Sequence, residues 1–360
     1  MAEAILVLNA GSSSLRAALF DDEGGRRDFH YAGIGREGLP DHANAIEALL
    51  AELGTVELAA IGHRVVHGGE ATEPVRRVDC IERLRLDDLL HLAPLHLPAN
   101  LAGIDLCAER LDVSHYACFD TAFHATLDPL ARRLPIPERY GMQRYGFHGI
   151  SYSAVARRLP ELLGEGRARG RVVVAHLGNG SSLCLIEEGC SRDTTMGFTP
   201  SGGVPMATRC GDIDPGVVVE LASRLAPDAL AELVSRQSGL LALSGGLTGD
   251  MRRLLETEGE APRFAVDYYC RAVRGAIGAL AAKAGGLDAL IFTGGIGEHA
   301  AAVREAICAP LAFLGIQIDA QANQAGYGAI HRDGSLPVLV VPTDEEAEIA
   351  RLVRQARDGA

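Results

Sequence analysis

The chain has 360 residues, of which 48% are hydrophobic and 22% are charged. This composition is typical of a folded globular protein and excludes a disordered or collagen-like chain, and the length suggests two domains of about 150 residues each. Lys and Arg total 34 and Asp and Glu total 47, so the formal net charge is −13. That acidity argues against nucleic acid or an anionic membrane as a partner.

The first residues, MAEAILVLNAG, predict a β-strand and not an export signal, because Glu3 stands where a signal peptide carries a basic residue. No apolar run approaches the roughly 18 residues needed to cross a bilayer. The eight cysteines are scattered and lack a CxxC spacing. Most lie in apolar segments, which favours reduced thiols over disulfides. These features together predict a cytoplasmic protein.

An internal repeat organises the chain. Residues 4–20 read AILVLNAGSSSLRAALF and residues 172–186 read VVVAHLGNGSSLCLI, so that Ser13 aligns with Ser181. Each copy is an apolar run, a turn of Gly, Ser and Asn, and a second apolar run, which predicts a β-hairpin whose backbone N–H groups can contact phosphate oxygens. One copy alone would favour an ordinary hairpin. Two copies spaced like two domains resemble the duplicated βββαβα plan of sugar kinases, actin and heat-shock ATPases.

A long helix is predicted over residues 263–284 by apolar residues that recur at helical spacing. These are Tyr269, Val273, Ile277 and Leu280. The next segment, LDALIFTGGIGEH, predicts a buried strand that leads into a glycine turn. Nucleotides commonly bind at such a turn in open α/β sheets, so this segment is a candidate for the nucleoside end of a site.

The last segment, VLVVPTDEEAEIARLVRQAR, predicts a strand and a helix. The spacing of Thr343 and Glu346 predicts a capping box with Thr343 as the N-cap. Asp344 and Glu345 have two interpretations that the sequence leaves open. They either complement the helix dipole, or one of them is a Mg²⁺ ligand, because Mg²⁺ prefers hard oxygen donors.

The segment GHRVVHGG, residues 62–69, has two histidines four positions apart. Its valines predict a strand, on which four residues span about 13 Å, so His63 and His67 should not bind one metal ion. Arg64 is a permanent cation between apolar residues. Its burial would be offset by a bound carboxylate or phosphate, or alternatively by an internal salt bridge.

Three further residues are candidates for chemistry. Asp120 in CFDTAFH follows an apolar run, and its role as general base, Mg²⁺ ligand or structural cap is open. His148 in YGFHG lies in a predicted turn, where an imidazole either faces a ligand or is structural. Arg209 lies in a long loop rich in Gly and Pro. Two arginines, an acid and a histidine would suit phosphoryl transfer, whose transition state needs positioning and charge compensation.

Taken in order, these motifs resemble the acetate/propionate kinase family nearly from end to end. The resemblance implies reversible, direct in-line transfer of a phosphoryl group from ATP to acetate, giving acetyl phosphate and ADP. It also implies Mg²⁺ as cofactor, with Mn²⁺ as a substitute, and a cytoplasmic homodimer. The chain departs from the family pattern at Arg16, where a Lys is usual, and at His299, where an Asn is usual.

The resemblance implies a role for each matching residue. The Mg²⁺ site would include Asn9 and Glu345. The catalytic residues would be Arg64, which also binds the carboxylate, Asp120, His148 and Arg209. The pocket for the acyl chain would be formed with Arg64 by Val66, Leu95, Phe147 and Pro200. The ATP site would be formed by Ser12, Ser14, Arg16, His176, Leu177, Gly178, Asn179, Gly180, Asp250, Met251, Arg252, Gly295, Ile296, Gly297, Glu298 and His299.

The expected fold is α/β, with duplicated βββαβα domains of the ribonuclease H-like, actin-like ATPase type and an active-site cleft between them. The expected domains are residues 1–124 together with 347–360, closed by the C-terminal helix, and residues 125–346, which bind the nucleotide. The nearest alternative is a kinase for propionate or another short-chain carboxylate, because one methylene is worth only about 1–3 kcal/mol.

Two more distant alternatives share the fold. A sugar or polyol kinase would need Asp120 as a general base for the acceptor hydroxyl. An ATPase that drives conformational change or assembly would leave Arg64 and Arg209 without a purpose. The phosphoryl donor, ATP or pyrophosphate, and the physiological direction stay open.

Overall fold

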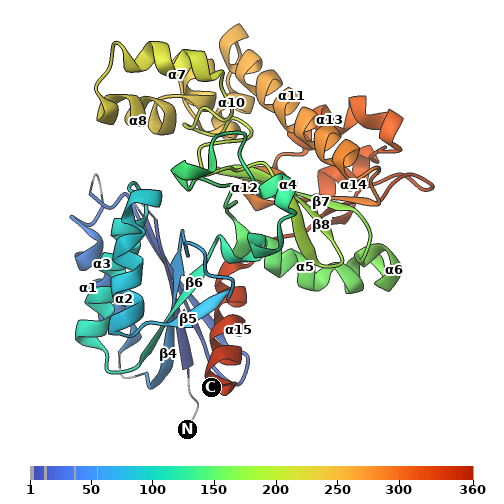
Figure 1. Ribbon diagram of the computed structural model, residues 1–360. Coiled ribbons are helices and arrows are strands. Elements are labelled where there is room, and N and C mark those ends of the chain that lie inside the picture. The colour runs from blue at the N-terminus through green and yellow to red at the C-terminus, as the bar shows by residue number, and fades with distance from the viewer. Residues whose placement is uncertain (1–3, 12–13, 36–37, 55, 360) are drawn as a thin grey trace. The chain divides into compact units, whose positions relative to one another are not determined.

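Figure 1 shows a computed structural model of the chain, which describes residues 4–11, 14–35, 38–54 and 56–359. The chain divides into two compact units. The N-terminal unit comprises Met1–Ala125, Gly149–Ala154 and Asp344–Ala360, and the C-terminal unit comprises Thr126–His148 and Val155–Thr343. The predicted domain boundaries, which follow residues 124 and 346, stay a prediction.

The described part of the N-terminal unit contains a six-stranded sheet in the order β3-β2-β1-β4-β6-β5. Its strands are β1 (Ala4–Ala10), β2 (Ser14–Phe20), β3 (Arg26–Ala32), β4 (Leu58–Val65), β5 (Val75–Arg77) and β6 (Ser114–Phe119). Its helices are α1 (His42–Leu53), α2 (Cys80–Asp88), α3 (Leu97–Arg110), the start of α5 (Gly149–Leu163) and α15 (Glu345–Asp358). Strands β1, β4 and β6 are parallel neighbours, so their carboxyl ends lie at one edge of the sheet.

Helices cover both faces of this sheet, α1 and α3 on one side and α15 on the other (Figure 1). Successive side chains of a strand point to opposite faces of its sheet, so the side chains of β1 divide between these two helical layers. Leu6 and Leu8 lie in a core cluster with α1 and α3, whereas Ile5 and Val7 lie in a cluster with α15. Gly62 of β4 lets α15 approach closely, because a Cβ there would lie 2.7 Å from a methyl group of Ile349.

The described part of the C-terminal unit contains a second six-stranded sheet in the order β11-β12-β10-β7-β8-β9. Its strands are β7 (Val172–Leu177), β8 (Ser181–Glu187), β9 (Cys190–Thr194), β10 (Ala289–Thr293), β11 (Gly328–Ala329) and β12 (Val338–Val340). Its helices are α4 (Pro129–Arg132), the end of α5, α6 (Glu165–Ala168), α7 (Pro215–Ala222), α8 (Pro227–Arg236), α9 (Gly239–Leu243), α10 (Met251–Glu256), α11 (Glu260–Lys283), α12 (Gly294–His299), α13 (Ala301–Cys308) and α14 (Ala320–Ala325). Short 3₁₀ segments lie at Leu90–Leu92, Ala122–Thr126, Glu138–Tyr140 and Ala309–Leu314.

The two sheets have the same topology. In each, an antiparallel three-strand meander leads into parallel strands, β1-β4-β6 in the first unit and β7-β10-β12 in the second. The repeated hairpins predicted from the sequence are β1–β2 and β7–β8. The predicted α/β fold with duplicated ribonuclease H-like domains is therefore confirmed.

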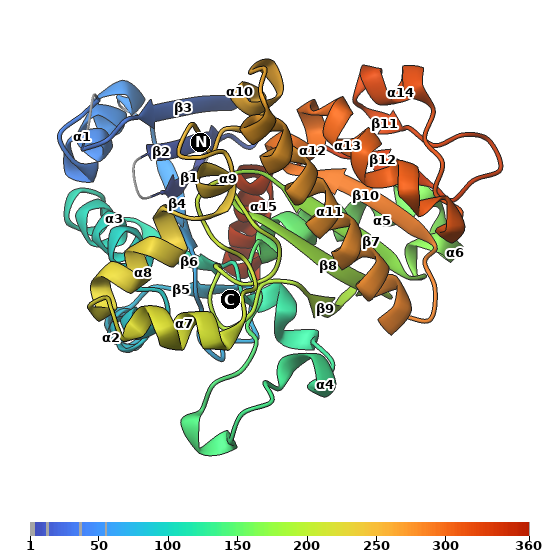
Figure 2. The ribbon, with the colours of Figure 1, turned by 90° about the horizontal axis from the view of Figure 1, so that it is seen from above.

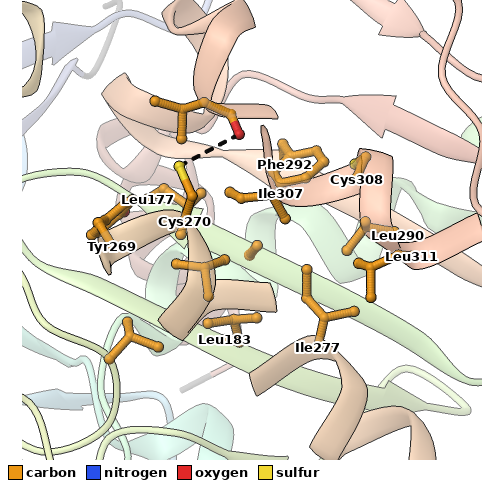
Figure 3. Close-up of a cluster of buried hydrophobic side chains, with 14 of the residues drawn as sticks. Leu177, Leu183, Tyr269, Cys270, Ile277, Leu290, Phe292, Ile307, Cys308 and Leu311 are labelled. Carbon is orange, nitrogen blue, oxygen red and sulfur yellow. Dashed lines mark hydrogen bonds between the residues drawn. The ribbon is translucent and has the colours of Figure 1, made fainter. Parts of the chain in front are cut away.

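Helix α11 confirms the helix predicted over residues 263–284. Its apolar stripe is buried, with Tyr269, Val273 and Ile277 fully inaccessible to solvent. Figure 2 shows α11 crossing the sheet over β7 and β8. The stripe forms part of the core cluster that Figure 3 shows in close-up.

One local prediction was wrong. The N-cap of α15 is Asp344, whose carboxylate accepts a hydrogen bond of 2.9 Å from the backbone N–H of Ala347, and not Thr343. Asp is at least as strong an N-cap as Thr. Thr343 precedes the helix and donates its backbone N–H to Glu298 at 3.2 Å, so the capping box with Glu346 does not form.

All eight cysteines are free thiols. Among the described residues, no helix combines the length and the apolar character that crossing a bilayer requires.

Candidate active site

In the N-terminal unit, Asn9, Arg64 and Asp120 stand at the carboxyl ends of the parallel strands β1, β4 and β6. Strand periodicity places Asn9 on the same face as Ile5 and Val7, which is the face that α15 covers. The carboxyl edge of parallel strands is where open α/β sheets bind ligands. The three predicted residues are therefore brought to one edge by topology.

These residues contact one another and Glu345, the first residue of α15. The Arg64 guanidinium donates a hydrogen bond to Asp120, and its Nη1 lies 3.4 Å from the Asn9 Oδ1. Its Nε lies 3.8 Å from the Glu345 Oε2. Asp120 is fully buried, and the Arg64 side chain is 19% exposed. The internal salt bridge that the sequence left open for Arg64 is thus present, and it joins two residues of the candidate site.

Two carboxylates face the single guanidinium of Arg64. Burial raises the pKa of Glu345 to about 7; the Arg64 charge opposes this shift and the Asp120 charge reinforces it. The second oxygen of Asp120, Oδ1, is buried without a hydrogen-bond partner in the described structure. A cation beside these two carboxylates would relieve both the excess of negative charge and the unpartnered oxygen.

The donor set fits Mg²⁺. Carboxylate and amide oxygens from Asp120, Glu345 and Asn9 are hard ligands of the kind that Mg²⁺ prefers. The described residues contain no group of three or more His, Cys, Asp or Glu side chains that could hold a metal ion. Mg²⁺ does not need such a group, because it usually binds through one or two carboxylates, substrate phosphates and water.

Two of the predicted acyl-pocket residues, Val66 and Leu95, belong to this unit. Val66 follows the end of β4 and is buried, and Leu95 is partly buried in the turn before α3. Asn100 of α3 accepts a hydrogen bond from the Val66 N–H at 3.0 Å and donates one to the Ala10 carbonyl at 2.9 Å. Sequence reasoning missed Asn100. Its signal was an amide within the apolar stripe of a helix, a position normally taken by a core residue.

The predicted ATP contacts of the first hairpin are Ser12, Ser14 and Arg16. Ser12 lies outside the described residues. Ser14 begins β2, where its carbonyl accepts a hydrogen bond of 2.8 Å from the Gly11 N–H. Arg16 is exposed on β2 and is the cross-strand partner of Asn9. Its charge lowers the pKa of Glu345, in opposition to the larger effect of burial.

The histidines of GHRVVHGG lie in separate environments. His63 Nε2 is 3.0 Å from Nδ1 of His115, and burial lowers the pKa of His63 to about 3. His67 Nδ1 accepts a hydrogen bond of 2.9 Å from the Gly69 N–H. Each imidazole thus has a structural partner of its own.

In the C-terminal unit, His148 is held in an uncommon conformation. It is the N-cap of α5, with φ of 58°, in the left-handed region that non-glycine residues rarely adopt. Its Nδ1 lies 2.8 Å from the Ser182 Oγ, and its ring stacks on His176 with the centroids 4.3 Å apart. Backbone strain of this kind is concentrated at functional sites.

Gly180 marks the place where two donors converge. A Cβ at this position would lie 3.1 Å from the His148 Nε2 and 3.3 Å from the Arg209 Nη1. The Arg209 guanidinium also donates to the Pro200 carbonyl at 3.1 Å, so two predicted site residues are in contact. Phe147 is buried beside His148 in the chain. Because glycine occupies position 180, the His148 Nε2 and the Arg209 Nη1 can both approach one small space at the hairpin tip.

The hairpin tip packs against the predicted nucleotide turn on α12. A Cβ on Gly178 would lie 3.9 Å from the Gly295 N, and one on Gly294 would lie 2.8 Å from the Leu177 carbonyl. The Leu177 side chain belongs to the hydrophobic core, so its backbone alone lines the tip. Asn179 is exposed at the tip, and its carbonyl accepts a hydrogen bond of 3.2 Å from the Ala207 N–H.

Hydrogen bonds with two charged side chains hold the backbone of the α12 turn. Glu298 accepts a hydrogen bond of 2.9 Å from the Gly294 N–H. The wholly buried Arg304 donates to the Gly297 carbonyl at 2.8 Å. Ile296 is partly buried against the core, and His299 is exposed at the end of the turn.

The predicted nucleoside contacts Asp250, Met251 and Arg252 lie at the start of α10. Asp250 is the N-cap and accepts a hydrogen bond of 2.8 Å from the Arg252 N–H. Met251 is a core residue and Arg252 is exposed. Among the described residues, no hydrogen bond or ion pair joins these three residues directly to the hairpin tip. The preceding Gly249 packs against Ala207, where a Cβ on Gly249 would clash with the Ala207 carbonyl oxygen, and the Ala207 N–H donates to the Asn179 carbonyl at the tip. Their contact with the nucleoside stays a prediction.

Comparison with known proteins gives a consistent result. The profile of the Acetokinase family matches residues 35–351. An acetate kinase of Leifsonia xyli subsp. xyli is 43% identical over 391 aligned positions, with 98% of each chain covered. The chain belongs to the Acetokinase family. An acetate kinase of Clostridium botulinum is 40% identical, covering 96% of this chain and 98% of its own.

Solved structures related to the Acetokinase family agree with the fold. The crystal structure of Porphyromonas gingivalis acetate kinase has a TM-score of 0.87 and 34% identity, and the alignment covers 97% of this chain and 98% of that one. A propionate kinase from Francisella tularensis has a TM-score of 0.88 and 32% identity, with the same shares covered. The family resemblance read from the sequence motifs is therefore confirmed.

Proposed function

We propose that this chain catalyses reversible, Mg²⁺-dependent transfer of the γ-phosphoryl group of ATP to acetate, giving acetyl phosphate and ADP. The observation that carries the proposal is the convergence of the His148 Nε2 and the Arg209 Nη1 on the space above Gly180. Two N–H donors on one small space at a glycine-rich tip suit the oxygens of a transferring phosphoryl group. Membership of the Acetokinase family supplies the substrate class.

The reaction divides among the residues as follows. An acetate oxygen attacks the γ-phosphorus in line, the bond from that phosphorus to the bridging oxygen breaks, and its electron pair stays on ADP. Arg64 binds the carboxylate, and His148 and Arg209 compensate the charge on the transferring group. No general base is needed, because acetate, like other carboxylates, is already ionised at neutral pH. Asp120 therefore acts in metal binding and positioning.

Asn9, Asp120 and Glu345 would hold the Mg²⁺ ion or its bound water. When bound, the ion neutralises charge on the phosphate oxygens, and Mn²⁺ would supply the same chemistry. Val66, Leu95, Phe147 and Pro200 would accommodate the acyl chain. The glycine-rich tips and the α12 turn would hold ATP. We also propose that the protein is cytoplasmic and forms a homodimer.

Propionate is the second candidate substrate. The specific observation in its favour is the propionate kinase from Francisella tularensis, whose structure resembles this chain as closely as the acetate kinase structure does. One methylene changes transition-state binding by only about 1–3 kcal/mol, so both acids are expected to react to different degrees.

The test is a hydroxamate assay, which traps acyl phosphate, with MgATP and acetate, propionate, butyrate or no acid. Acyl phosphate from acetate or propionate, lost in Arg209→Ala, supports the proposal. Arg224→Ala is the matched control, because Arg224 lies in the same unit with a side chain that is 69% exposed. Folded protein that binds MgATP and yet makes no acyl phosphate with any acid, with ATP or pyrophosphate as donor, would overturn it.

A further inference from the structure

Two consecutive serines at the start of β8, Ser181 and Ser182, are fully buried and point to opposite faces of the sheet. The Ser181 side chain points to the same face of the sheet as that of Leu183, which packs in the core beneath α11. Ser182 is the cross-strand partner of His176. A buried hydroxyl needs a hydrogen-bond partner, and each of these serines has a partner in a different part of the candidate site.

We infer that the two serines are positioning residues with separate tasks in phosphoryl transfer. Ser181, held by Tyr269, fixes the hairpin tip that receives the nucleotide phosphates. Ser182 orients the His148 imidazole toward the transferring group. This inference rests on the proposed function and assigns roles in the reaction to residues for which the sequence motifs implied none.

The Ser181 hydroxyl connects helix α11 to the hairpin tip. Its Oγ lies 2.9 Å from the Tyr269 hydroxyl and donates to the Gly178 carbonyl at 3.0 Å. Tyr269 is fully buried, in the same cluster as Leu177 and Leu183 (Figure 3). Burial raises the pKa of Tyr269, so its hydroxyl stays protonated and can donate to Ser181. The hydrogen bonds therefore run in one direction, from Tyr269 through Ser181 to Gly178.

This relay acts on a tip that has little rigidity of its own. Gly178 and Gly180 frame Asn179, and glycine has the largest backbone freedom of any residue. The Gly178 N–H donates to the Gly180 carbonyl at 3.0 Å, which closes the tip, and the Ser181 Oγ lies 3.3 Å from the same nitrogen. Holding Gly178 thus sets the direction of the backbone N–H groups that would face phosphate.

The Ser182 hydroxyl acts on His148. Its Oγ lies 2.8 Å from Nδ1, on the opposite side of the imidazole from Nε2. With the hydroxyl donating to Nδ1, a neutral imidazole carries its proton on Nε2. Nε2 is the nitrogen that faces the space above Gly180 together with Arg209. Stacking on His176 fixes the plane of the ring, so Ser182 and His176 together select orientation and tautomer.

The two tasks predict opposite kinetic signatures. Tyr269→Phe keeps the buried ring and removes only the hydroxyl, so KM for ATP should rise about three- to tenfold, the value of one hydrogen bond, with kcat unchanged. Ser181→Ala should act in the same way. Ser182→Ala should lower kcat about tenfold and leave KM for ATP unchanged, because the lost interaction serves the transition state.

Matched controls separate positioning from general destabilisation. Tyr268→Phe removes the hydroxyl of the neighbouring tyrosine on α11, which is 49% exposed. Ser191→Ala removes another fully buried serine from the same sheet. Both controls should retain wild-type KM and kcat. If Tyr269→Phe and Ser182→Ala match the wild type as well, or if both change the same parameter, the division of tasks is overturned.

Two further measurements do not depend on catalytic turnover. Titration calorimetry with MgADP should show weaker binding in Tyr269→Phe and unchanged binding in Ser182→Ala. The ¹⁵N shifts of the His148 imidazole should change in Ser182→Ala and not in Ser191→Ala, which reports the tautomer directly. If folded wild-type protein makes no acyl phosphate, the proposed function fails, yet these two results still decide whether the serines act as inferred.

Discussion

The two compact units each contain a group of candidate functional residues, and the two groups differ in chemistry. In the N-terminal unit, Arg64, Asp120 and Glu345 are charged side chains that contact one another at the edge of a sheet. In the C-terminal unit, His148 and Arg209 stand over a glycine, supported by hydroxyls and backbone carbonyls. The first group has more carboxylates than cations, and the second has an imidazole nitrogen and a guanidinium nitrogen at its centre.

This difference matches the ligands that each group would bind. An excess of buried carboxylate suits a divalent cation, and Arg64 among them suits one short carboxylate anion. Converging N–H donors suit phosphate oxygens. The two groups should also differ in how much they contribute to stability. Removing one member of a buried ion pair should destabilise the fold more than displacing one hydrogen-bonding group does.

Arg64→Ala should have the largest effect. Loss of the carboxylate contact should lower kcat/KM for acetate about 10²–10³-fold. The unfolding free energy should fall by about 3–5 kcal/mol, because Asp120 is left buried without its partner. The hydroxamate assay and urea unfolding measure the two effects.

Arg110→Ala is the control for this variant. Its side chain is 46% exposed and pairs with the exposed Glu47 in the same unit, so the substitution should lower the unfolding free energy by no more than about 1 kcal/mol. The double variant Arg64→Ala, Asp120→Ala should recover stability and not activity. A single Arg64→Ala protein as stable as the wild type would show that the pair is not buried as described.

The titration of Glu345 should make the metal-free protein less stable at alkaline pH. Its pKa is about 7 in the folded chain, above the usual value for a glutamate. Its stabilising contribution is therefore present below the unfolded pKa and is lost as pH rises through 7, where the folded chain must ionise a buried carboxyl. From pH 5 to pH 8 the unfolding free energy should fall by up to about 3 kcal/mol from this group.

Urea unfolding without Mg²⁺ at the two pH values measures this loss, and Glu345→Gln should abolish it. The exposed residue Glu23 provides the control substitution, Glu23→Gln. Added Mg²⁺ should restabilise the wild type at pH 8 more than it restabilises Glu345→Gln. An identical pH dependence in all three proteins would rule out the raised pKa of Glu345.

Gly180→Ala tests the second group without removing a donor. The new methyl would lie 3.1 Å from the His148 Nε2, so the imidazole must shift by a few tenths of an ångström. We expect kcat to fall about tenfold, because small misplacements in a preorganised site slow the reaction, with little change in Tm. Gly197→Ala, in the same unit with nothing within 4 Å of a new Cβ, is the control. Equal kcat in both variants would show that the space above Gly180 takes no part in the reaction.

Val66→Ala should have the smallest effect and a specific one. A shorter side chain beside the carboxylate site leaves room for a longer acid, so the ratio of kcat/KM for propionate to that for acetate should rise about fivefold. Val75→Ala changes a valine of the same unit outside the predicted pocket. An unchanged ratio in Val66→Ala, with activity intact, would place the acyl chain elsewhere.

Much of this arrangement was predictable from local pattern. The repeated β-hairpins and α11 follow from hydrophobic periodicity, which is set by which face of an element is buried. Arg64 and Asp120 could be singled out because a charged residue at the end of an apolar strand is uncommon. The N-cap of α15 was misassigned, because Thr343 and Asp344 are both good caps and the choice depends on the hydrogen bond from Thr343 to Glu298.

Asn100, Ser182 and Tyr269 were not predictable in the same way. Each acts through a hydrogen bond to a residue far away in the sequence, Asn100 to Val66, Ser182 to His148 and Tyr269 to Ser181. Serine and tyrosine are common residues, and nothing in their neighbours along the chain marks a buried partner. The apolar stripe around Asn100 marks its burial but not the residue that it contacts. Such contacts exist only after strands and helices have packed.

The sequence by itself determined the duplicated architecture, the family and the identity of the charged residues, because these depend on composition, periodicity and ordered motifs. The tertiary structure alone decided that Arg64 lies between two carboxylates, that burial raises the pKa of Glu345 to about 7 and that His148 and Arg209 converge over Gly180. The physical reason is that pKa values and donor geometry depend on distances and burial. Both are set by packing between elements that are remote along the chain.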